Sequence, residues 1–211
     1  MMVEQAPSRR ERAAAHARMD ILNAAASAFA RAGYSATKMS DIATEAGYTA
    51  ASLYTYFPSK RAIFKAMGEL LLVELLETLD RPLPGGLDTE QALEVRLFRL
   101  FEWVEGRRDG FKVLFAMRWS GEPDLAPEPG EPDHTEGETA IQARFQAWFS
   151  EPAAVGADAY GGRPPEFLAS ALHGLIMGSF MLWLTGPDSG SLASQAPMVT
   201  EFSFHGTRGR S

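Results

Sequence analysis

The sequence of 211 residues contains no cysteine. This absence excludes disulfide scaffolds, thiol catalysis and every Cys-ligated zinc or iron–sulfur site. Residues 1–16 lack the apolar core that a secretory signal peptide needs, so we expect a cytoplasmic protein. The chain also lacks a Walker loop, a glycine-rich dinucleotide motif after a strand, and a paired nucleophile and base. We therefore expect no enzyme and no cofactor, because catalysis would have to be assembled from residues far apart in the sequence.

Strand patterns are also missing. No segment of convincing length alternates apolar and polar residues, and no internal repeat is present. Apolar residues recur instead at helical spacing, first after a capping box formed by Ser8 and Glu11 and up to Gly33. We predict an all-α fold with helices near residues 8–32, 40–46, 50–56, 59–79, 89–107, 109–120, 138–150 and 164–185, and a short one near 194–205.

Charge is unevenly distributed along the chain. The formal net charge is -7 at pH 7, which by itself argues against a nucleic-acid partner. Residues 1–61, however, contain eight Lys and Arg against five Asp and Glu, a net charge of +3, and the remainder carries −10. Such asymmetry indicates two parts with different tasks.

Residues 37–60 carry the sharpest motif. Two short predicted helices joined by a turn at Gly47 form a helix-turn-helix, whose second helix can lie in a DNA major groove. At about 100° per residue, the inner side of that helix has Ala50, Leu53 and Phe57, with Tyr54 at its edge. The outer side is small, hydroxylated and aromatic, with no acid: Ala51, Ser52, Thr55 and Tyr56. Thr49 is placed to cap the helix.

The run GYSATKMSDIATEAGYTAASLYTYFPSKRAIF resembles the DNA-binding segment of the tetracycline-repressor (TetR) family of transcriptional regulators. The resemblance rests on Gly33-Tyr34, Thr37, Ile42-Ala43, Ala46-Gly47, Leu53-Tyr54, Tyr56-Phe57, Lys60 and Phe64, in order and without gaps. It implies a three-helix DNA-binding domain over residues 1–60 and a helical ligand-binding and dimerisation domain over 61–211. Such regulators, most commonly repressors, bind a palindromic double-stranded operator as homodimers, and a small-molecule effector releases the DNA.

The resemblance also implies the DNA-binding residues. Positions facing bases or adjoining phosphates are Ala50, Ala51, Ser52, Thr55 and Tyr56; Thr37, Tyr54 and Lys60 match phosphate-contacting positions, and Lys38 belongs to the same surface. A cation in the first turn of a helix opposes the helix dipole by about 0.3–1 kcal/mol, so Lys60 needs compensation such as a phosphate. The alternative is a solvated lysine. Tyr34 and Tyr48 are predicted to be packing residues.

The predicted second helix has no Arg, Asn or Gln, the side chains that make bidentate contacts with guanine or adenine. Base reading then relies on hydroxyls, methyl groups and water. We predict that phosphate contacts supply most of the affinity, with steep salt dependence. The basic segment over residues 9–12 has two interpretations, minor-groove or phosphate contacts, or a flexible solubilising tail.

Residues 167–184 contain a single ionisable side chain, that of His173. The run is at the short end for a membrane span, which takes about 20 residues, and is rich in small residues. A stripe of them permits close helix approach: Ser170, Ala171, Gly174 and Gly178. We predict a dimer interface here and no membrane association.

Effector-binding candidates are the bulky side chains Trp103, Phe115, Trp119, Phe145, Trp148 and Met177, with His173 as a polar sensor. Each of them also fits a plain core position, and His173 fits a hydrogen-bonded core histidine. As a set they suit a bulky hydrophobic effector. An acidic segment over residues 121–138, with His134, is predicted to be a solvated loop rather than a metal site, because a Pro- and Gly-rich run does not converge ligands. A helical module without DNA would leave the 37–60 motif unexplained.

Overall fold

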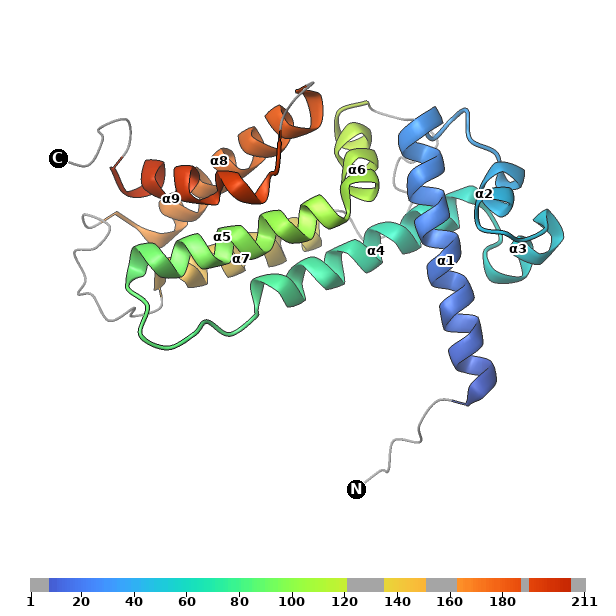
Figure 1. The fold of residues 1–211 in the computed structure, drawn as a ribbon, viewed down its shortest axis with the longest axis horizontal. Helices are drawn as coiled ribbons and strands as arrows, with labels where there is room; N and C mark the ends of the chain where they lie inside the picture. The colour runs from blue at the N-terminus through green and yellow to red at the C-terminus, as the bar shows by residue number, and fades with distance from the viewer. Residues whose placement is uncertain (1–7, 121–134, 151–162, 187–189, 206–211) are drawn as a thin grey trace. The chain divides into compact units, whose positions relative to one another are not determined.

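The computed structural model describes residues 8–120, 135–150, 163–186 and 190–205 (Figure 1). Every regular element in these segments is helical, which confirms the predicted fold class. The elements are α1 (Arg9–Ala32), α2 (Met39–Glu45), α3 (Ala50–Tyr56), α4 (Lys60–Leu79), α5 (Thr89–Gly106), α6 (Arg108–Ser120), α7 (Thr135–Ser150), α8 (Pro165–Thr185), the 3-10 helix η2 (Ala193–Gln195) and α9 (Ala196–His205).

The helix ends follow local side-chain chemistry. The backbone N–H of Glu11 donates to Ser8 Oγ at 3.2 Å, and that of Ser8 donates to Glu11 Oε2 at 2.7 Å, which confirms the predicted capping box. Asp88 and Gln91 form an equivalent box at the start of α5. Most boundaries differ from the prediction by one residue or less, and the largest difference is at α7. This helix begins at Thr135, so residues 135–137 are helical although we predicted loop up to 137. Residues 121–134, including His134, lie outside the described part of the chain.

The chain divides into two compact units. The first comprises α1, α2, α3, the part of α4 up to Leu71, and α6; the second comprises the rest of α4 with α5, α7, α8, η2 and α9. Within the first unit, α6 lies against α1, and the first half of α4 continues the same core. The boundary at residue 60 between a DNA-binding and a ligand-binding domain stays a prediction.

The first unit has a core in which α1, α2, α3 and α4 meet. Ile21, Ile42, Leu53 and Ile63 are completely buried there, one from each helix. Each fully buried side chain of this size contributes about 1.5–3 kcal/mol. Three rings complete the core, with Tyr34 at 5.3 Å from Phe29 and 5.6 Å from Phe64 between centroids. Tyr34 is therefore a packing residue, as predicted.

The second unit is built around contacts of α5 with α9 and of α7 with α8. Phe101 and Phe180 lie at 5.6 Å between ring centroids with their planes steeply inclined. The indole N–H of buried Trp183 donates to the carbonyl oxygen of Gly190 at 3.1 Å, so the end of α8 is tied to the segment before η2. Glu105 of α5 accepts from the backbone N–H of Ala193 at 3.2 Å. These contacts fix α9 beside α5.

Helix α8 is long and apolar enough to cross a membrane by length and composition, and its most apolar 18-residue window is 33% buried. Core helices of globular proteins pass the same test. The remainder of its surface is largely apolar or small, with Phe167, Met181 and Leu182 among the most exposed large side chains. Burial on one side and exposure on the other leave one apolar face of α8 uncovered in the single chain.

Candidate functional site

Helix α3 is defined at both ends by its sequence. The turn before it contains Gly47 with φ +76°, a left-handed conformation that favours glycine. Thr49 Oγ1 then accepts from the backbone N–H of Ser52 at 3.1 Å, as predicted for the cap. The helix ends where Phe57 becomes extended, immediately before Pro58, which cannot continue it. The bounds agree with the prediction of 50–56.

The exposed surface of α3 differs in part from the inner and outer sides that we predicted at about 100° per residue. Leu53 is fully buried and Phe57 nearly so, as expected for the inner side. Ala50 and Tyr54, however, are exposed, and the Tyr54 side chain is 55% accessible. A helix of seven residues covers little core, so Leu53 alone fills the inner position within it. Ala50 and Tyr54 thus join Ala51 and Thr55 on the open face.

Tyr56 and Ser52 are half-buried rather than open. The Tyr56 ring packs edge-on against Tyr48 at 6.1 Å between centroids. Burial raises the pKa of Tyr48, with a further rise from the charge of the nearby Asp20 carboxylate. Tyr48 thus packs against Tyr56 and lies near Asp20 of α1, which supports its packing role. Tyr56 and Ser52 are thus less exposed than Ala51 and Thr55, and a DNA contact by Tyr56 stays a prediction.

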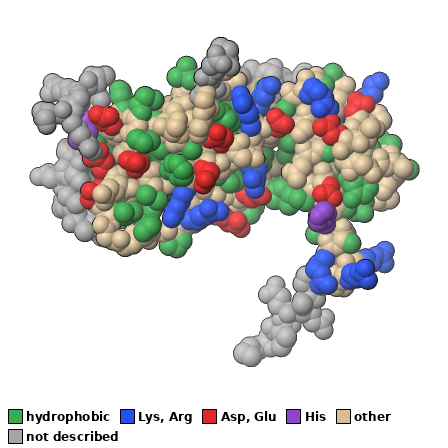
Figure 2. Space-filling model, in the orientation of Figure 1, with side chains coloured by type: hydrophobic (Ala, Val, Ile, Leu, Met, Phe, Trp, Pro, Cys, Tyr) green, Lys and Arg blue, Asp and Glu red, His purple; other side chains and the backbone are tan. Residues whose placement is uncertain are grey.

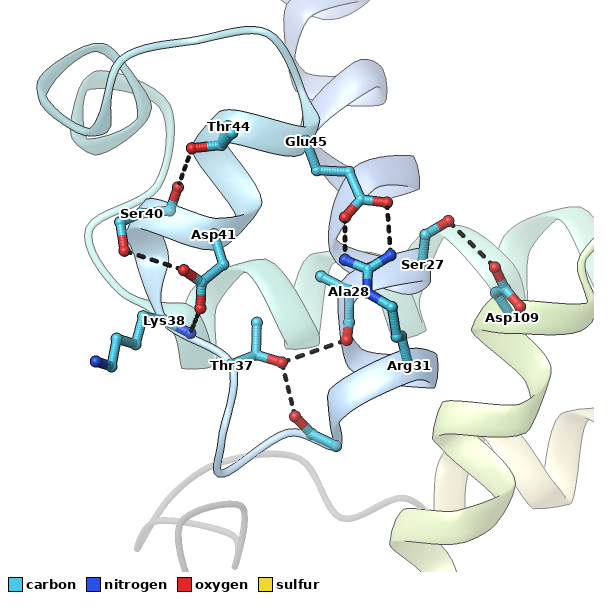
Figure 3. Close-up of polar contacts among 11 residues, drawn as sticks. Ser27, Ala28, Arg31, Thr37, Lys38, Ser40, Asp41, Thr44, Glu45 and Asp109 are labelled. Atoms are coloured by element: carbon cyan, nitrogen blue, oxygen red, sulfur yellow. Dashed lines mark hydrogen bonds and ion pairs between the residues drawn. The ribbon is translucent and has the colours of Figure 1, made fainter.

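The loop between α1 and α2 holds two predicted DNA-binding residues in contrasting positions (Figure 3). Thr37 is buried, and its hydroxyl donates to the carbonyl oxygen of Gly33 at 2.7 Å, so its side chain faces the loop interior rather than the surface. Lys38 is exposed, and Figure 3 shows its side chain directed away from the residues around Asp41. The backbone N–H of Lys38 donates to Asp41 Oδ2 at 2.9 Å and anchors the residue at the start of α2.

Lys60, at the start of α4, has partners within the chain. Its Nζ donates to the carbonyl oxygens of Tyr34 at 2.7 Å, Thr37 at 3.0 Å and Ser35 at 3.3 Å. The same ammonium lies 4.2 Å from the centroid of the Tyr34 ring. The compensation that a cation in the first turn needs is therefore present inside the protein. Neither alternative considered from the sequence, a phosphate contact or a solvated lysine, included these carbonyls.

Helix α1 contributes a further basic residue that sequence reasoning missed. Arg18 Nη1 donates to the carbonyl oxygen of Tyr56 at 2.7 Å, and its guanidinium carbon lies 4.2 Å from the Phe57 ring centroid. Arg31 forms a two-point pair with Glu45, which joins α1 to α2 (Figure 3). The hydrogen bond from Arg31, and then its charge, hold the pKa of Glu45 below its ordinary value of 4.5.

The basic segment over residues 9–12 is part of α1 and not a flexible tail. Arg9, Arg10 and Arg12 are exposed in its first turn, and Figure 2 shows a group of Lys and Arg side chains at this end of the helix. Cations at a helix N-terminus oppose the helix dipole, and Glu11 in the same turn favours it.

Comparison with known proteins agrees with this geometry. Residues 21–67, which span α1 to α4, match the sequence profile of the bacterial regulatory proteins of the tetR family. This stretch of the chain is therefore similar to the N-terminal segment of tetR-family regulators. Over 111 residues the chain is 28% identical to the HTH-type transcriptional activator FasR of Mycolicibacterium smegmatis, covering 53% of this chain and 51% of that protein. The chain thus spans about half the length of the curated relatives it matches.

Solved structures of similar fold cover nearly the whole chain. The transcriptional regulator FadR of Bacillus subtilis, crystallised with stearoyl-CoA, is 18% identical with a TM-score of 0.69, over 90% of this chain and 99% of that one. SmeT of Stenotrophomonas maltophilia, the repressor of the multidrug efflux pump SmeDEF, is 20% identical with a TM-score of 0.64, over 88% and 87%. At these identities the likeness establishes the shared fold.

The predicted dimer residues lie together on the uncovered face of α8. Ser170, Ala171, Gly174 and Gly178 are all exposed in the single chain. A Cβ added at Gly174 or Gly178 would meet no atom within 4 Å. Met198 and Phe202 of α9 are also exposed, at 62% and 46%.

The predicted effector residues are brought together only in part. The Phe145 ring lies 5.0 Å from Trp148 and 5.9 Å from His173, which joins α7 to α8. Trp103 and Met177 are half-buried in the same unit, and Phe115 belongs to the other unit. The Trp119 side chain lies outside the described part. A cavity of about 220 Å³ at the end of α4 includes Trp148, beside the paired side chains of Asp80 and Arg144 and the guanidinium of Arg96.

Proposed function

We propose that the chain is a transcriptional regulator that binds a palindromic operator as a homodimer and places α3 in the major groove. The open face of α3 carries this proposal, because Ala51, Tyr54 and Thr55 are exposed with no acidic residue beside them in that helix. Leu53 anchors the opposite side in the core. Small side chains permit close approach to base edges, and hydroxyls supply hydrogen bonds to bases and phosphates.

Affinity is expected to come mainly from phosphate contacts. Helix α3 has no Arg, Asn or Gln, and the Thr55 hydroxyl already donates to the Ser52 carbonyl oxygen at 2.6 Å, so it is left to act as an acceptor. Exposed cations for phosphates are Lys38 and the arginines in the first turn of α1. The logarithm of the binding constant should therefore fall steeply with the logarithm of salt concentration.

The proposed homodimer uses the uncovered face of α8 with the adjoining face of α9. The face has no charged side chain along Ser170, Ala171, Gly174, Gly178 and Leu182, and Leu182 is 71% exposed. A second copy of the chain would bury this apolar surface and account for its exposure. A membrane would bury it as well, so sedimentation in detergent-free buffer decides between the two: a homogeneous dimer supports the proposal, and recovery only with the membrane fraction contradicts it.

The proposed effector is a bulky hydrophobic small molecule held in the second unit. Support comes from the side chains Phe145, Trp148 and His173, which cluster between α7 and α8, and from FadR, whose fold is similar and which was crystallised with stearoyl-CoA. Thermal denaturation with a panel of acyl compounds tests this assignment, since a ligand of the native state raises the midpoint. We propose repression, with effector release of DNA, as the direction of control.

DNA binding is tested by mobility shift with the DNA upstream of the gene for this chain. Tyr54→Ala and Thr55→Ala change only exposed side chains of α3, so circular dichroism should remain unchanged while affinity falls. Glu94→Ala, on an exposed position of α5, is the matched control and should bind as the wild type does. Unchanged binding of both α3 variants would contradict the placement of α3 at the DNA. A reporter gene behind the same DNA shows whether the bound protein represses or activates.

A further inference from the structure

We propose that Arg18 and Lys60 are positioning residues that hold α3 and the loop before α2 from inside the protein, and that neither is a DNA-contacting cation. This inference rests on the proposed function for its DNA-binding consequence. The tethers themselves are contacts of the first unit and can be tested without DNA. Because Arg18 and Lys60 are engaged inside the protein, they are not counted among the basic residues that contact the operator.

Arg18 acts at the C-terminal end of α3. Its guanidinium donates to the carbonyl oxygen of Tyr56, the last residue of the helix, at 2.7 Å and stacks on Phe57, the next residue, at 4.2 Å. The last carbonyls of a helix have no intrahelical partner, and a positive charge there complements the helix dipole. A helix of seven residues is not stable alone, so contacts at its ends decide its position.

Lys60 acts on the loop that leads into α2. A lysine ammonium has three donors, and three carbonyl oxygens, those of Tyr34, Ser35 and Thr37, lie within 2.7–3.3 Å of Nζ. The Tyr34 ring, 5% exposed, covers the same ammonium at 4.2 Å. A phosphate at this position would have to replace contacts that already satisfy the group. The lysine therefore joins the start of α4 to the chain 23–26 residues earlier.

Together the two side chains bracket α3. Arg18 holds its last carbonyl to α1, and Lys60, four residues after Tyr56, holds the following helix to the α1–α2 loop. Binding sites need their contacting groups held within about 0.5 Å by supporting residues. Removal of either tether should therefore reduce operator affinity through the position of α3, while the number of phosphates that the protein neutralises stays the same.

The salt dependence of binding separates these mechanisms. Arg18→Met and Lys60→Met are compared with Lys38→Met, whose parent side chain is exposed and directed away from the protein (Figure 3). The probe is a duplex carrying the DNA upstream of the gene. We expect each of the two tether variants to bind at least tenfold more weakly, with the slope of log K against log salt unchanged. Lys60→Met removes three hydrogen bonds, and Arg18→Met removes a charge-assisted hydrogen bond together with the contact with Phe57. Lys38→Met should reduce the slope by about 0.9 for each phosphate that Lys38 neutralises in the wild type.

If Arg18→Met or Lys60→Met reduced the slope of log K against log salt by about 0.9, the assignment of that residue as a positioning residue would be overturned. Hydrogen exchange of the DNA-free protein supplies the second readout. Arg18→Met should accelerate exchange of the amides in 53–57 by tenfold or more, with Ile21 and Ile63 amides unchanged, and Arg18→Lys should partly restore protection. Unchanged exchange in 53–57, or equal acceleration throughout the unit, would contradict a local tether. Failure of the wild type to bind DNA would count against the proposed function only.

Discussion

Leucine in place of Gly178 should separate the proposed dimer without harming the single chain. Glycine inside a helix costs about 1 kcal/mol relative to alanine. Gly174 and Gly178 both lie within α8, and a Cβ at either position would meet open space. Nothing within the described part of the chain therefore accounts for glycine at these positions. Close approach of a second helix would account for it, because side-chain size limits the distance between two helices.

The expected magnitude follows from symmetry. Overpacking a well-packed contact costs about 1–3 kcal/mol per site, and a two-fold interface contains each substitution twice. Gly178→Leu should thus weaken the dimer by about 2–6 kcal/mol, which corresponds to roughly 30-fold to 10⁴-fold in the dissociation constant. Gly178→Ala should be milder in the dimer, and in the separated chain it should raise the free energy of unfolding by about 1 kcal/mol.

Sedimentation equilibrium over a dilution series measures the dissociation constant, and urea denaturation of the dilute protein measures the stability of the single chain. Ala143→Leu, on an exposed position of α7, adds a comparable apolar side chain elsewhere and should leave the dissociation constant unchanged. The reasoning would be refuted if Gly178→Leu dimerised as tightly as the wild type. It would also be refuted by a wild-type protein that sediments as a monomer at all concentrations.

Three other substitutions test the fold and the first unit. Thr49→Ala removes the cap of α3 and should cost about 1 kcal/mol, seen as faster exchange of the Ser52 amide; unchanged exchange would contradict the cap. Phe101→Ala empties a fully buried position and should cost about 3–5 kcal/mol, measured as the shift of the urea midpoint. The lowered pKa of Glu45 means that its stabilising contribution is present above the ordinary value of 4.5 and is lost as pH falls through the lower folded value. Glu45→Gln should remove up to about 1 kcal/mol of stability at neutral pH, and the difference from wild type should vanish in acid; a constant difference would contradict it.

The sequence was sufficient to predict the elements, since their boundaries are set by neighbours along the chain. Ser8 and Glu11 predicted the start of α1, and Thr49 and Pro58 bounded α3 to the residue. We predicted a later start for α7 because the preceding sequence is rich in Pro and Gly. The helix nevertheless begins at Thr135. Local chemistry was enough wherever the deciding contacts lay within three or four residues.

Contacts between distant residues were not predictable in the same way. The dipole argument for Lys60 correctly demanded an electronegative partner, but the sequence cannot show that the oxygens of a loop 23–26 residues earlier supply it. Arg18 carried no distinguishing signal, because its acceptor is a backbone carbonyl 38 residues away. The helical spacing placed Ala50 on the inner side and Tyr54 at its edge, but both are exposed. Helical spacing gives the direction of each side chain within one helix, and it does not show how much of that helix its neighbours cover.

Helix α4 has a mechanical consequence for the loop before α2. It runs without interruption over 20 residues, about 30 Å at 1.5 Å per residue, and begins at Lys60. A rotation of α4 about its own axis moves Lys60, because a continuous ladder of backbone hydrogen bonds transmits the rotation along the helix. The loop carbonyls held by Lys60 are then the first bonds to bear that torque.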